Sequence, residues 1–232
     1  MKKNVLGVIL CRSNSSRLKD KLKLRIEKKD TFSIFVDRLK KCKQINKLVI
    51  STTMNKEDDC FKMFAIKNNM PYYRGSEKNV WHRFSSSIKS LNQKFDIVVR
   101  CNADNPLIMP TIIDEDIINF KKKNYDFFSP FYKNQIPFGY ALTIFKSKNI
   151  LEIYKKNLSK KYREHIDNYF IENLERFKVL DKYNPKYFCP NLFLTLDTKF
   201  DYNRIKFYYK KIKNIGFKKQ PEKLISIFKN LQ

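Results

Sequence analysis

The stretch Asn4-Val-Leu-Gly-Val-Ile-Leu-Cys11, followed directly by Arg12-Ser-Asn-Ser-Ser-Arg-Leu-Lys-Asp-Lys21, decides the fold. Its first half is a continuous apolar run, which is typical of a strand buried on both faces of a parallel sheet. Its second half is a polar loop rich in cations and hydroxyls. Ligands of open α/β sheets bind beyond the carboxyl ends of the strands. The loop at 12–21 is therefore the first candidate site.

The rest of the first half repeats this alternation of strand and helix. We expect strands at 47–52, 70–73 and 95–101, and helices around 34–42 and at 56–68, 79–91 and 111–122. Units of roughly 20–25 residues in this order predict an α/β fold with a doubly wound, mostly parallel sheet. Ligand-binding residues are then expected near 51–53, 74–75 and 102–104, where these strands end.

The second half is less regular. Strands are expected at 125–129, 140–145 and 193–196, and helices at 147–155, 163–174, 200–212 and 220–231. The sequence contains no internal repeat, low-complexity linker or Gly/Ser-rich hinge. We therefore expect a single domain over 1–232.

The formal net charge is +26, with 49 Lys and Arg against 23 Asp and Glu. Only ten of the cations are arginine, and the lysines are spread along the whole chain, as in a protein encoded by an AT-rich genome. This distribution does not favour a nucleic-acid partner, because net charge alone reports on non-specific association. Where lysine is the usual cation, each arginine is a candidate for bidentate recognition, which lysine cannot provide.

The sequence also bears on location. No apolar run reaches the ~18 residues that span a bilayer, so no membrane insertion is expected. No signal-peptide pattern is present. The five cysteines are scattered without a CxxC pair, which fits a reducing cytoplasm better than a disulfide framework or a zinc site.

Arg12, Arg17, Lys21 and Ser15 are the candidate phosphate ligands in the first loop. Forked guanidinium groups, a lysine point charge and hydroxyls are the groups that a polyphosphate requires. The loop lacks the GxxxxGK[ST] pattern of a Walker A motif. The alternative is a solvated surface loop, which would serve equally well for the lysines but explains the two arginines less well.

Asp104 and Asp197 are the candidate metal ligands, each close behind an expected strand. Mg²⁺ beside substrate phosphates takes one or two protein carboxylates. The structural alternatives are an Asx turn at Asp104 and a helix N-cap at Asp197. Arg74 and Asn102 are candidate nucleotide ligands, although Gly75 alone would suffice for a turn at 74–75. Arg83 and Arg100 fit a buried ion pair as well as a ligand contact.

Together these segments resemble the cytidylyltransferases that activate Kdo and sialic acids, in particular the SpsF-type branch of spore coat polysaccharide biosynthesis. The resemblance rests on five further segments that follow one another in the family's order: Ile50-Ser-Thr-Thr53, Tyr73–Phe84 (family "FRGSEDDVLDRY"), Val98–Pro110 ("VVRITGDCPLIDP"), Arg163-Glu-His165 ("REHV") and Leu194–Asp201 ("LTVDTPED"). It covers about residues 4 to 212.

The resemblance implies a Rossmann-like, GT-A-like nucleotide-diphospho-sugar transferase fold, with a nucleotide-binding half at about 1–110 and a sugar-binding half at about 111–232. It also implies catalysis by Arg12, Lys21 and Asp104, and Mg²⁺ on Asp104 and Asp197. Arg163 and His165 begin an expected helix whose electropositive N-terminus suits a sugar carboxylate, although His165 alone fits a structural hydrogen-bonding role better. The expected activity is transfer from CTP to an acidic, nonulosonic or Kdo-like sugar. Relatives often dimerise, which makes a homodimer a partner to consider.

The sequence departs from the family pattern in two places. The first loop has Asn14 and Lys19-Asp20 where the family has Gly and Pro-Gly, and Asn14 is expected to tolerate left-handed backbone. The family's "PDGLDVEVF" has become Pro137–Phe145, with Phe138, Ala141 and Thr143 in place of acids. If the family's acids bind sugar hydroxyls, these changes imply a more apolar acceptor pocket and a changed acceptor. They leave open a relative that has lost activity and serves as a binding or assembly subunit. A basic nucleic-acid binder is the third alternative.

Overall fold

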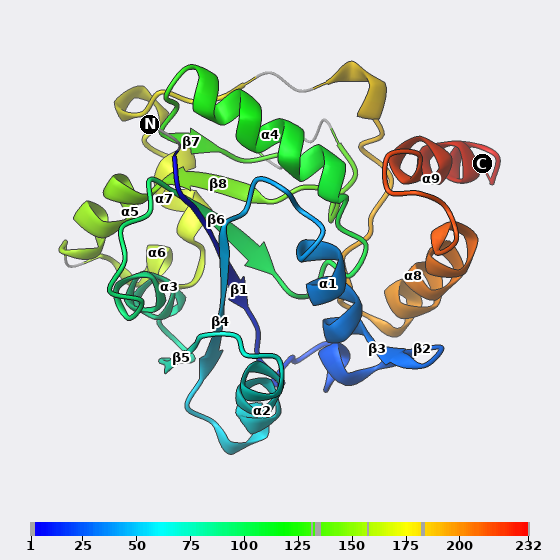
Figure 1. Cartoon of the computed structure of the whole chain (residues 1–232), viewed down its shortest axis with the longest axis horizontal. Coiled ribbons are helices and arrows are strands. Elements are labelled where there is room, and N and C mark those ends of the chain that lie inside the picture. The colour runs from blue at the N-terminus through cyan, green and yellow to red at the C-terminus, as the bar shows by residue number, and fades with distance from the viewer. Residues whose placement is uncertain (1–2, 131, 133–135, 157, 182–183, 232) are drawn as a thin grey trace.

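The computed structural model describes residues 3–130, 132, 136–156, 158–181 and 184–231. In this part of the chain a six-stranded sheet has the order β5-β4-β1-β6-β8-β7 (Figure 1). The strands β5, β4, β1 and β6 are parallel, whereas β8 pairs antiparallel with β6, and β7 antiparallel with β8. A separate hairpin joins β2 and β3. The predicted α/β fold with a mostly parallel sheet is confirmed.

The strands are β1 (Val5–Leu10), β2 (Arg25–Ile26), β3 (Lys29–Asp30), β4 (Lys47–Thr53), β5 (Tyr72–Gly75), β6 (Ile97–Asn102), β7 (Phe127–Phe128) and β8 (Thr143–Lys146). The α-helices are α1 (Thr31–Leu39), α2 (Asp59–Lys67), α3 (Val80–Lys89), α4 (Pro110–Lys122), α5 (Ser147–Tyr154), α6 (Lys160–Glu164), α7 (Ile166–Ile171), α8 (Lys199–Ile212) and α9 (Gln220–Lys229). Short 3₁₀ helices are η1 (Lys21–Lys23), η2 (Lys56–Asp58), η3 (Leu174–Arg176) and η4 (Pro185–Tyr187).

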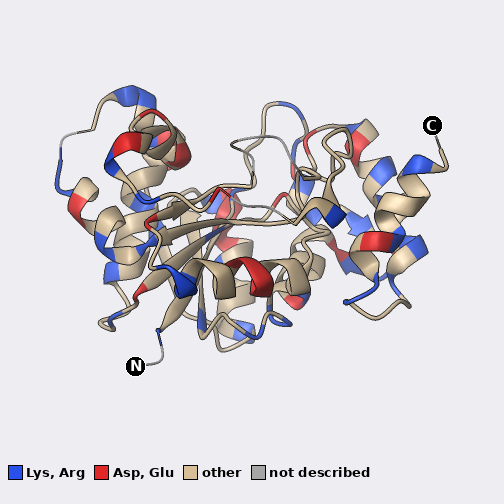
Figure 2. Cartoon of the chain, turned by 90° about the horizontal axis from the view of Figure 1, so that it is seen from above, with Lys and Arg blue, Asp and Glu red and all other residues tan. Residues whose placement is uncertain are grey.

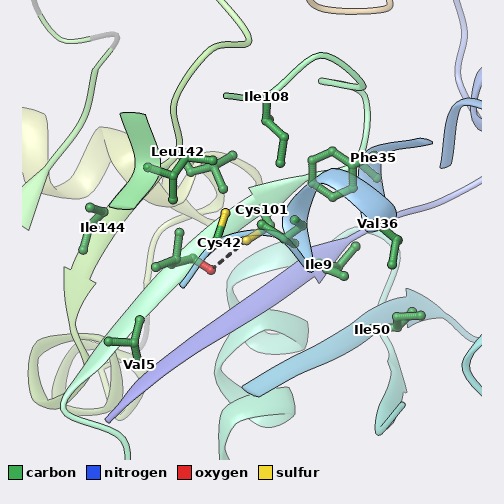
Figure 3. Packing of buried hydrophobic residues seen from close by; sticks show 14 of the residues in the cluster. Val5, Ile9, Phe35, Val36, Cys42, Ile50, Cys101, Ile108, Leu142 and Ile144 are labelled. Carbon is green, nitrogen blue, oxygen red and sulfur yellow. Dashed lines mark hydrogen bonds between the residues drawn. The ribbon is translucent and has the colours of Figure 1, made fainter. Parts of the chain in front are cut away.

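Strand β1 is buried along its whole length, as its apolar run predicts. Val5 and Ile9 point into one core, where they meet residues of α1, α2 and α4. Figure 3 shows Ile9 near Phe35 and Val36 of α1, and Val5 at the other end of β1. Leu6, Val8 and Leu10 of β1 point into a second core, formed with α3, α5 and α7. Side chains of a strand alternate between faces, so helices on both sides of the sheet require apolar residues at every position.

A third cluster of buried residues lies beyond α1 and α4, where α8 and α9 pack (Figure 1). It includes Ile34 of α1 and Ile112 of α4 together with Ile205 and Ile212 of α8 and Leu224 of α9. This packing holds α8 in place. The segment that leads into α8 therefore lies beside the turn that follows β6.

Four local expectations were wrong. Residues 193–196 form no strand; Phe193 makes one isolated bridge, with Phe138. The helix expected over 163–174 is broken at His165, whose φ of −111° and ψ of 90° are extended. The strand expected from 140 begins at Thr143. The β2–β3 hairpin was missed, because its turn uses Glu27 at a φ of 55°, without a glycine.

β1 lies inside the sheet, and the strands that follow it in the sequence are added on both of its sides. β4 and β5 extend the sheet on one side of β1, and β6 pairs on the other side. The carboxyl ends of β1 and β6 therefore flank the point where the strand order reverses, which is where open α/β sheets form a ligand crevice. No helix of the described residues is long and apolar enough to cross a membrane.

Candidate active site

A pocket of about 410 Å³ opens at this switch point. Leu10 and Cys11 from the end of β1 line it, and so do Arg100 and Asn102 from β6. The pocket is also lined by residues of the loop 12–21, of the segment after β6, of the α6–α7 junction and of the segment before α8. Ten residues were expected from the sequence to bind the nucleotide, the metal or the sugar, and eight of them line this pocket: Arg12, Ser15, Arg17, Lys21, Asn102, Asp104, His165 and Asp197.

Lys21 is the centre of the polar arrangement. Its Nζ lies 2.9 Å from Oδ2 of Asp104 and 2.8 Å from Oδ1 of Asp197. Burial disfavours the charged form of Lys21, but the two carboxylates more than offset this, so the pKa of Lys21 is raised above its usual value. The ammonium thus holds together two acids that lie 93 positions apart in the sequence.

The backbone explains why these two acids meet. The N–H of Leu196 donates to the carbonyl of Asp104 at 2.7 Å, and the N–H of Leu194 donates to the carbonyl of Phe138 at 2.7 Å. The segment before α8 is thereby fixed against the turn that follows β6. Asp197 is brought to Asp104 by this pairing and by the packing of α8.

The carboxylate of Asp197 is not the N-cap of α8. Thr198 caps the helix, with its hydroxyl accepting from the N–H of Asp201 and the carboxylate of Asp201 accepting from the N–H of Thr198. This capping box is a common solution for a helix N-terminus. It leaves Asp197 free to pair with Lys21 and with Nη2 of Arg17 at 3.0 Å.

The first loop is fastened by buried Asp58. Its carboxylate accepts from the N–H of Ser13 at 2.6 Å and from the hydroxyl of Thr53, and the hydroxyl of Ser13 donates to the carbonyl of Glu57 at 2.9 Å. The left-handed residue of the loop is Asp20, with a φ of 51°, whereas Asn14 has no positive φ. Side chains of the loop can thus project into the pocket from a fixed backbone.

Arg12 and Arg17 extend into solvent over the pocket. The side chain of Arg12 is 40% exposed and lies 4.0 Å from Glu77 and 3.7 Å from Glu164. That of Arg17 is 65% exposed. Exposed ion pairs of this kind contribute little to stability. Both guanidinium groups can therefore exchange these partners for an anionic ligand at small cost.

Arg83 and Arg100 also line the pocket. For both residues the sequence had left a ligand contact and a buried ion pair open. Arg83 is 2% exposed, donates to the carbonyls of Ser76 and Glu77, and has a pKa lowered by burial. A Cβ at Gly75 would come within 3.2 Å of Cγ of Arg83, so this glycine permits the close approach. Arg100 forms an ion pair with Asp167.

Arg74 and Arg163 do not line the pocket. The guanidinium of Arg74 donates to the carbonyls of Thr53 and Asn55, each at 2.8 Å, and pairs with Asp59 at 2.6 Å. It therefore braces the turn after β4. Arg163 is exposed on α6 and donates to the carbonyl of Leu158 at 3.1 Å. Glu164 and His165 line the pocket instead, because the chain turns at His165.

Phe138, Ala141 and Thr143 do not line the pocket either, so they do not make it apolar. Phe138 stacks on Phe193 with ring centroids 5.2 Å apart, and Ala141 is fully buried. The hydroxyl of Thr143 donates to Asp167 at 2.9 Å. The role of Asp167 was missed because it lies outside the segments that resemble the family. Glu77 and Glu164 lie inside two of these segments, but their contacts were not predicted.

Asp104 and Asp197 fit a divalent cation. A positive group, the ammonium of Lys21, already lies between their oxygens. No cluster of three or more His, Cys, Asp or Glu side chains suited to a metal occurs in the described ranges. Two carboxylates with room for phosphate oxygens and waters are the arrangement that Mg²⁺ prefers beside a nucleotide.

Comparisons with known proteins bear on the family of this chain. Residues 6–231 match the family model described as "Cytidylyltransferase". An uncharacterised protein of Methanocaldococcus jannaschii is 34% identical over 200 residues, covering 85% of this chain and 80% of its own length. The spore coat polysaccharide biosynthesis protein SpsF of Bacillus subtilis is 28% identical over 214 residues, covering 90% of this chain and 87% of SpsF.

A solved structure gives the same result at the level of the fold. The structure of a cytidylyltransferase from Leptospira borgpetersenii superposes with a TM-score of 0.85 at 27% identity, covering 100% of this chain and 95% of that one. The family match over residues 6–231 thus extends through all three buried clusters and includes the segment that carries Asp197. The chain belongs to the cytidylyltransferase family of nucleotidyltransferases, in the branch that includes SpsF.

Proposed function

We propose that this protein transfers the cytidylyl group of CTP to the hydroxyl of an acidic, Kdo-like or nonulosonic sugar, giving a CMP-sugar and pyrophosphate for surface polysaccharide synthesis. The observation that carries the proposal is the meeting of Lys21, Asp104, Asp197 and Arg17 in one pocket. The family supports CTP as the nucleotide. The reaction takes place in the cytoplasm, where the five free cysteines stay reduced.

The residues of the pocket act mainly through position and charge. The sugar oxygen attacks the α-phosphorus, and the bond from that phosphorus to the bridging oxygen of the β-phosphate breaks. Arg12, Arg17 and Lys21 bind the phosphates and stabilise the negative charge of the departing pyrophosphate. Ser15 donates its hydroxyl to a phosphate oxygen, and Asn102 presents a donor and an acceptor to the nucleoside.

Asp104 and Asp197 hold Mg²⁺ in this proposal. When bound there, the cation neutralises charge on the α-phosphate and lowers the pKa of the attacking hydroxyl. No side-chain base is then required, and the hydroxyl proton passes to solvent. His165, which also lines the pocket, contacts the sugar.

Pyrophosphate release tests the proposal. Purified protein with Mg²⁺ is assayed across four NTPs and a panel that includes Kdo and N-acetylneuraminic acid. We expect release from CTP only when an acidic sugar is present. Asp104→Ala should reduce the rate by roughly 100-fold or more, because it removes a metal ligand, and should leave the circular dichroism spectrum unchanged.

Glu152→Ala is the matched control. Glu152 is exposed on α5, and among the residues that the structure describes its carboxylate pairs only with Lys148, one helical turn away. Its removal should therefore not alter turnover. Retained turnover in Asp104→Ala would remove the metal assignment. Binding of CTP by calorimetry without release across the whole panel would instead indicate a non-catalytic relative.

A further inference from the structure

Arg100 is held from one side by a partly buried network of side chains from three elements. Its Nη1 donates to Oδ1 of Asp167 at 2.8 Å, and Oδ2 of Asp167 accepts from the hydroxyl of Thr143 at 2.9 Å. Arg100 on β6 and Thr143 on β8 face each other in the antiparallel register, and Asp167 comes from the first turn of α7. The side chains of Arg100 and Asp167 are only 14% and 13% exposed. The guanidinium is therefore fixed in direction.

The opposite edge of the same guanidinium has no partner. Nε of Arg100 is buried without a hydrogen bond, and within the described residues none joins Nη2. Nε–H and Nη2–H point the same way, and this pair matches the two oxygens of a carboxylate. A buried donor without an acceptor is costly. A ligand group that accepts hydrogen bonds from this edge would remove the cost, and so explains why an unpaired donor lies in the pocket wall.

The other charges of the pocket leave this edge available. Asp104 and Asp197 pair with Lys21, and Glu164 lies 3.7 Å from Arg12. No carboxylate of the described chain other than Asp167 lies within 4.0 Å of Arg100. Arg100 therefore offers an anion site within the pocket that is separate from the cations of the first loop.

Position along β6 separates this site from the phosphate-binding loop. Arg100 and Asn102 lie on one face of the strand, roughly 7 Å apart, with Asp104 following. Asp104 is in contact with Lys21 of the first loop. Arg100 is further back and contacts the second half of the chain through Asp167, and His165 lines the pocket two residues before Asp167.

We propose that the free edge of Arg100 binds the carboxylate of the acceptor sugar, and that Asp167 and Thr143 are positioning residues that aim this edge. This inference rests on the proposed function. It assigns the recognition of the acid to Arg100, for which the sequence left both a ligand contact and a buried ion pair open. It also explains why a threonine stands at position 143, where the sequence departs from the family pattern: the hydroxyl of Thr143 orients Asp167.

The test compares an acid with its neutral methyl ester. Binding of Kdo and of N-acetylneuraminic acid, and of the two esters, is measured by ligand-observed NMR with and without CTP. We expect the wild type to prefer an acid over its ester by roughly tenfold or more, equivalent to about 1.4 kcal/mol. Arg100→Gln should abolish the preference. Arg100→Lys should retain only part of it, because an ammonium lacks the paired donors.

Thr143 supplies the test of positioning. Thr143→Val removes the hydroxyl that orients Asp167 and should lower the preference for the acid, whereas Thr143→Ser should preserve it. A merely structural role would weaken acid and ester alike. Calorimetry should give CTP affinities within roughly twofold of the wild type in all of these variants.

Two results would overturn the inference. The first is a wild type that binds acid and ester equally, or binds neither sugar acid. The second is an Arg100→Gln variant that keeps the acid preference and loses CTP affinity, which would make Arg100 a phosphate ligand. A wild type that prefers the acid but neither binds CTP nor releases pyrophosphate would contradict the proposed function and leave the role of Arg100 standing.

Discussion

Lys21 is the residue at which the two parts of the pocket meet. Its ammonium contacts one acid that follows β6 and one that precedes α8. The sequence predicted Lys21 as a phosphate ligand from its place in the first loop, but the ion pairs with Asp104 and Asp197 could not be predicted. They depend on the path of the chain through α8, which local patterns do not encode.

The same limit applies to the arginines. Scarcity marked Arg12 and Arg17 as candidates, and both line the pocket. It also marked Arg74, whose donors are taken up by two carbonyls and a carboxylate away from the pocket. Composition can show that a guanidinium has a specific partner. It cannot show whether that partner is a ligand or the protein itself.

Asp116 on α4 is a buried acid outside the active site. Oδ2 has no hydrogen-bond partner in the described residues, and burial, together with the charge of Glu115, raises the pKa of Asp116 well above 3.8. A raised folded-state pKa means that the folded chain releases this proton less readily than the unfolded chain. Above pH 3.8 the ionisation of Asp116 therefore costs stability, and the cost grows with pH up to the folded-state pKa.

We predict that Asp116→Asn stabilises the protein at pH 7 by roughly 1–3 kcal/mol, and that the gain disappears as the pH falls toward 3.8. Thermal unfolding across this pH range measures it. Asp114→Asn on the same helix is the control, since Asp114 accepts from the N–H groups of Lys43 and Gln44, and it should destabilise. A constant or negative effect of Asp116→Asn at all pH values would contradict the burial argument.

At the scale of elements, the parallel strands were the most predictable part. β1, β4 and β6 follow continuous apolar or β-branched runs. Residues 193–196 carry a similar apolar pattern but are fixed by single backbone bonds to Phe138 and Asp104, not by a neighbouring strand. The break between α6 and α7 occurs at His165 without a glycine or proline. The position of this break is therefore set by tertiary packing. The break places His165 in the pocket.

The N-terminus of α8 gives a prediction at this scale. Thr198→Ala removes the hydroxyl that accepts from Asp201 and should cost about 1 kcal/mol of stability. It should also lower turnover, because Asp197 directly precedes the cap and its N–H donates to Asp201. Urea unfolding and pyrophosphate release measure the two effects. Thr198→Ser keeps the hydroxyl and should preserve both; loss of activity in the serine variant would show that the cap does not act through its hydroxyl.

At the scale of the whole molecule, the charge of +26 is dispersed. Figure 2 shows Lys and Arg on helices and loops around the molecule, interspersed with acidic residues. Contacts to phosphates make association with nucleic acid steeply salt-dependent. We predict that a gel shift with duplex DNA or single-stranded RNA gives no discrete complex at physiological salt. A specific, salt-resistant complex would instead support a nucleic-acid function.

The central claim concerns the whole pocket, in which cations from the first loop and two distant carboxylates bind one nucleotide and its metal. A crystal structure with CTP and Mn²⁺ tests it most directly, since manganese is located by its anomalous scattering. The account predicts an anomalous peak in contact with Asp104 and Asp197, with the phosphates on Arg12, Arg17 and Lys21. Nucleotide bound elsewhere, or a metal that contacts neither carboxylate, would contradict it.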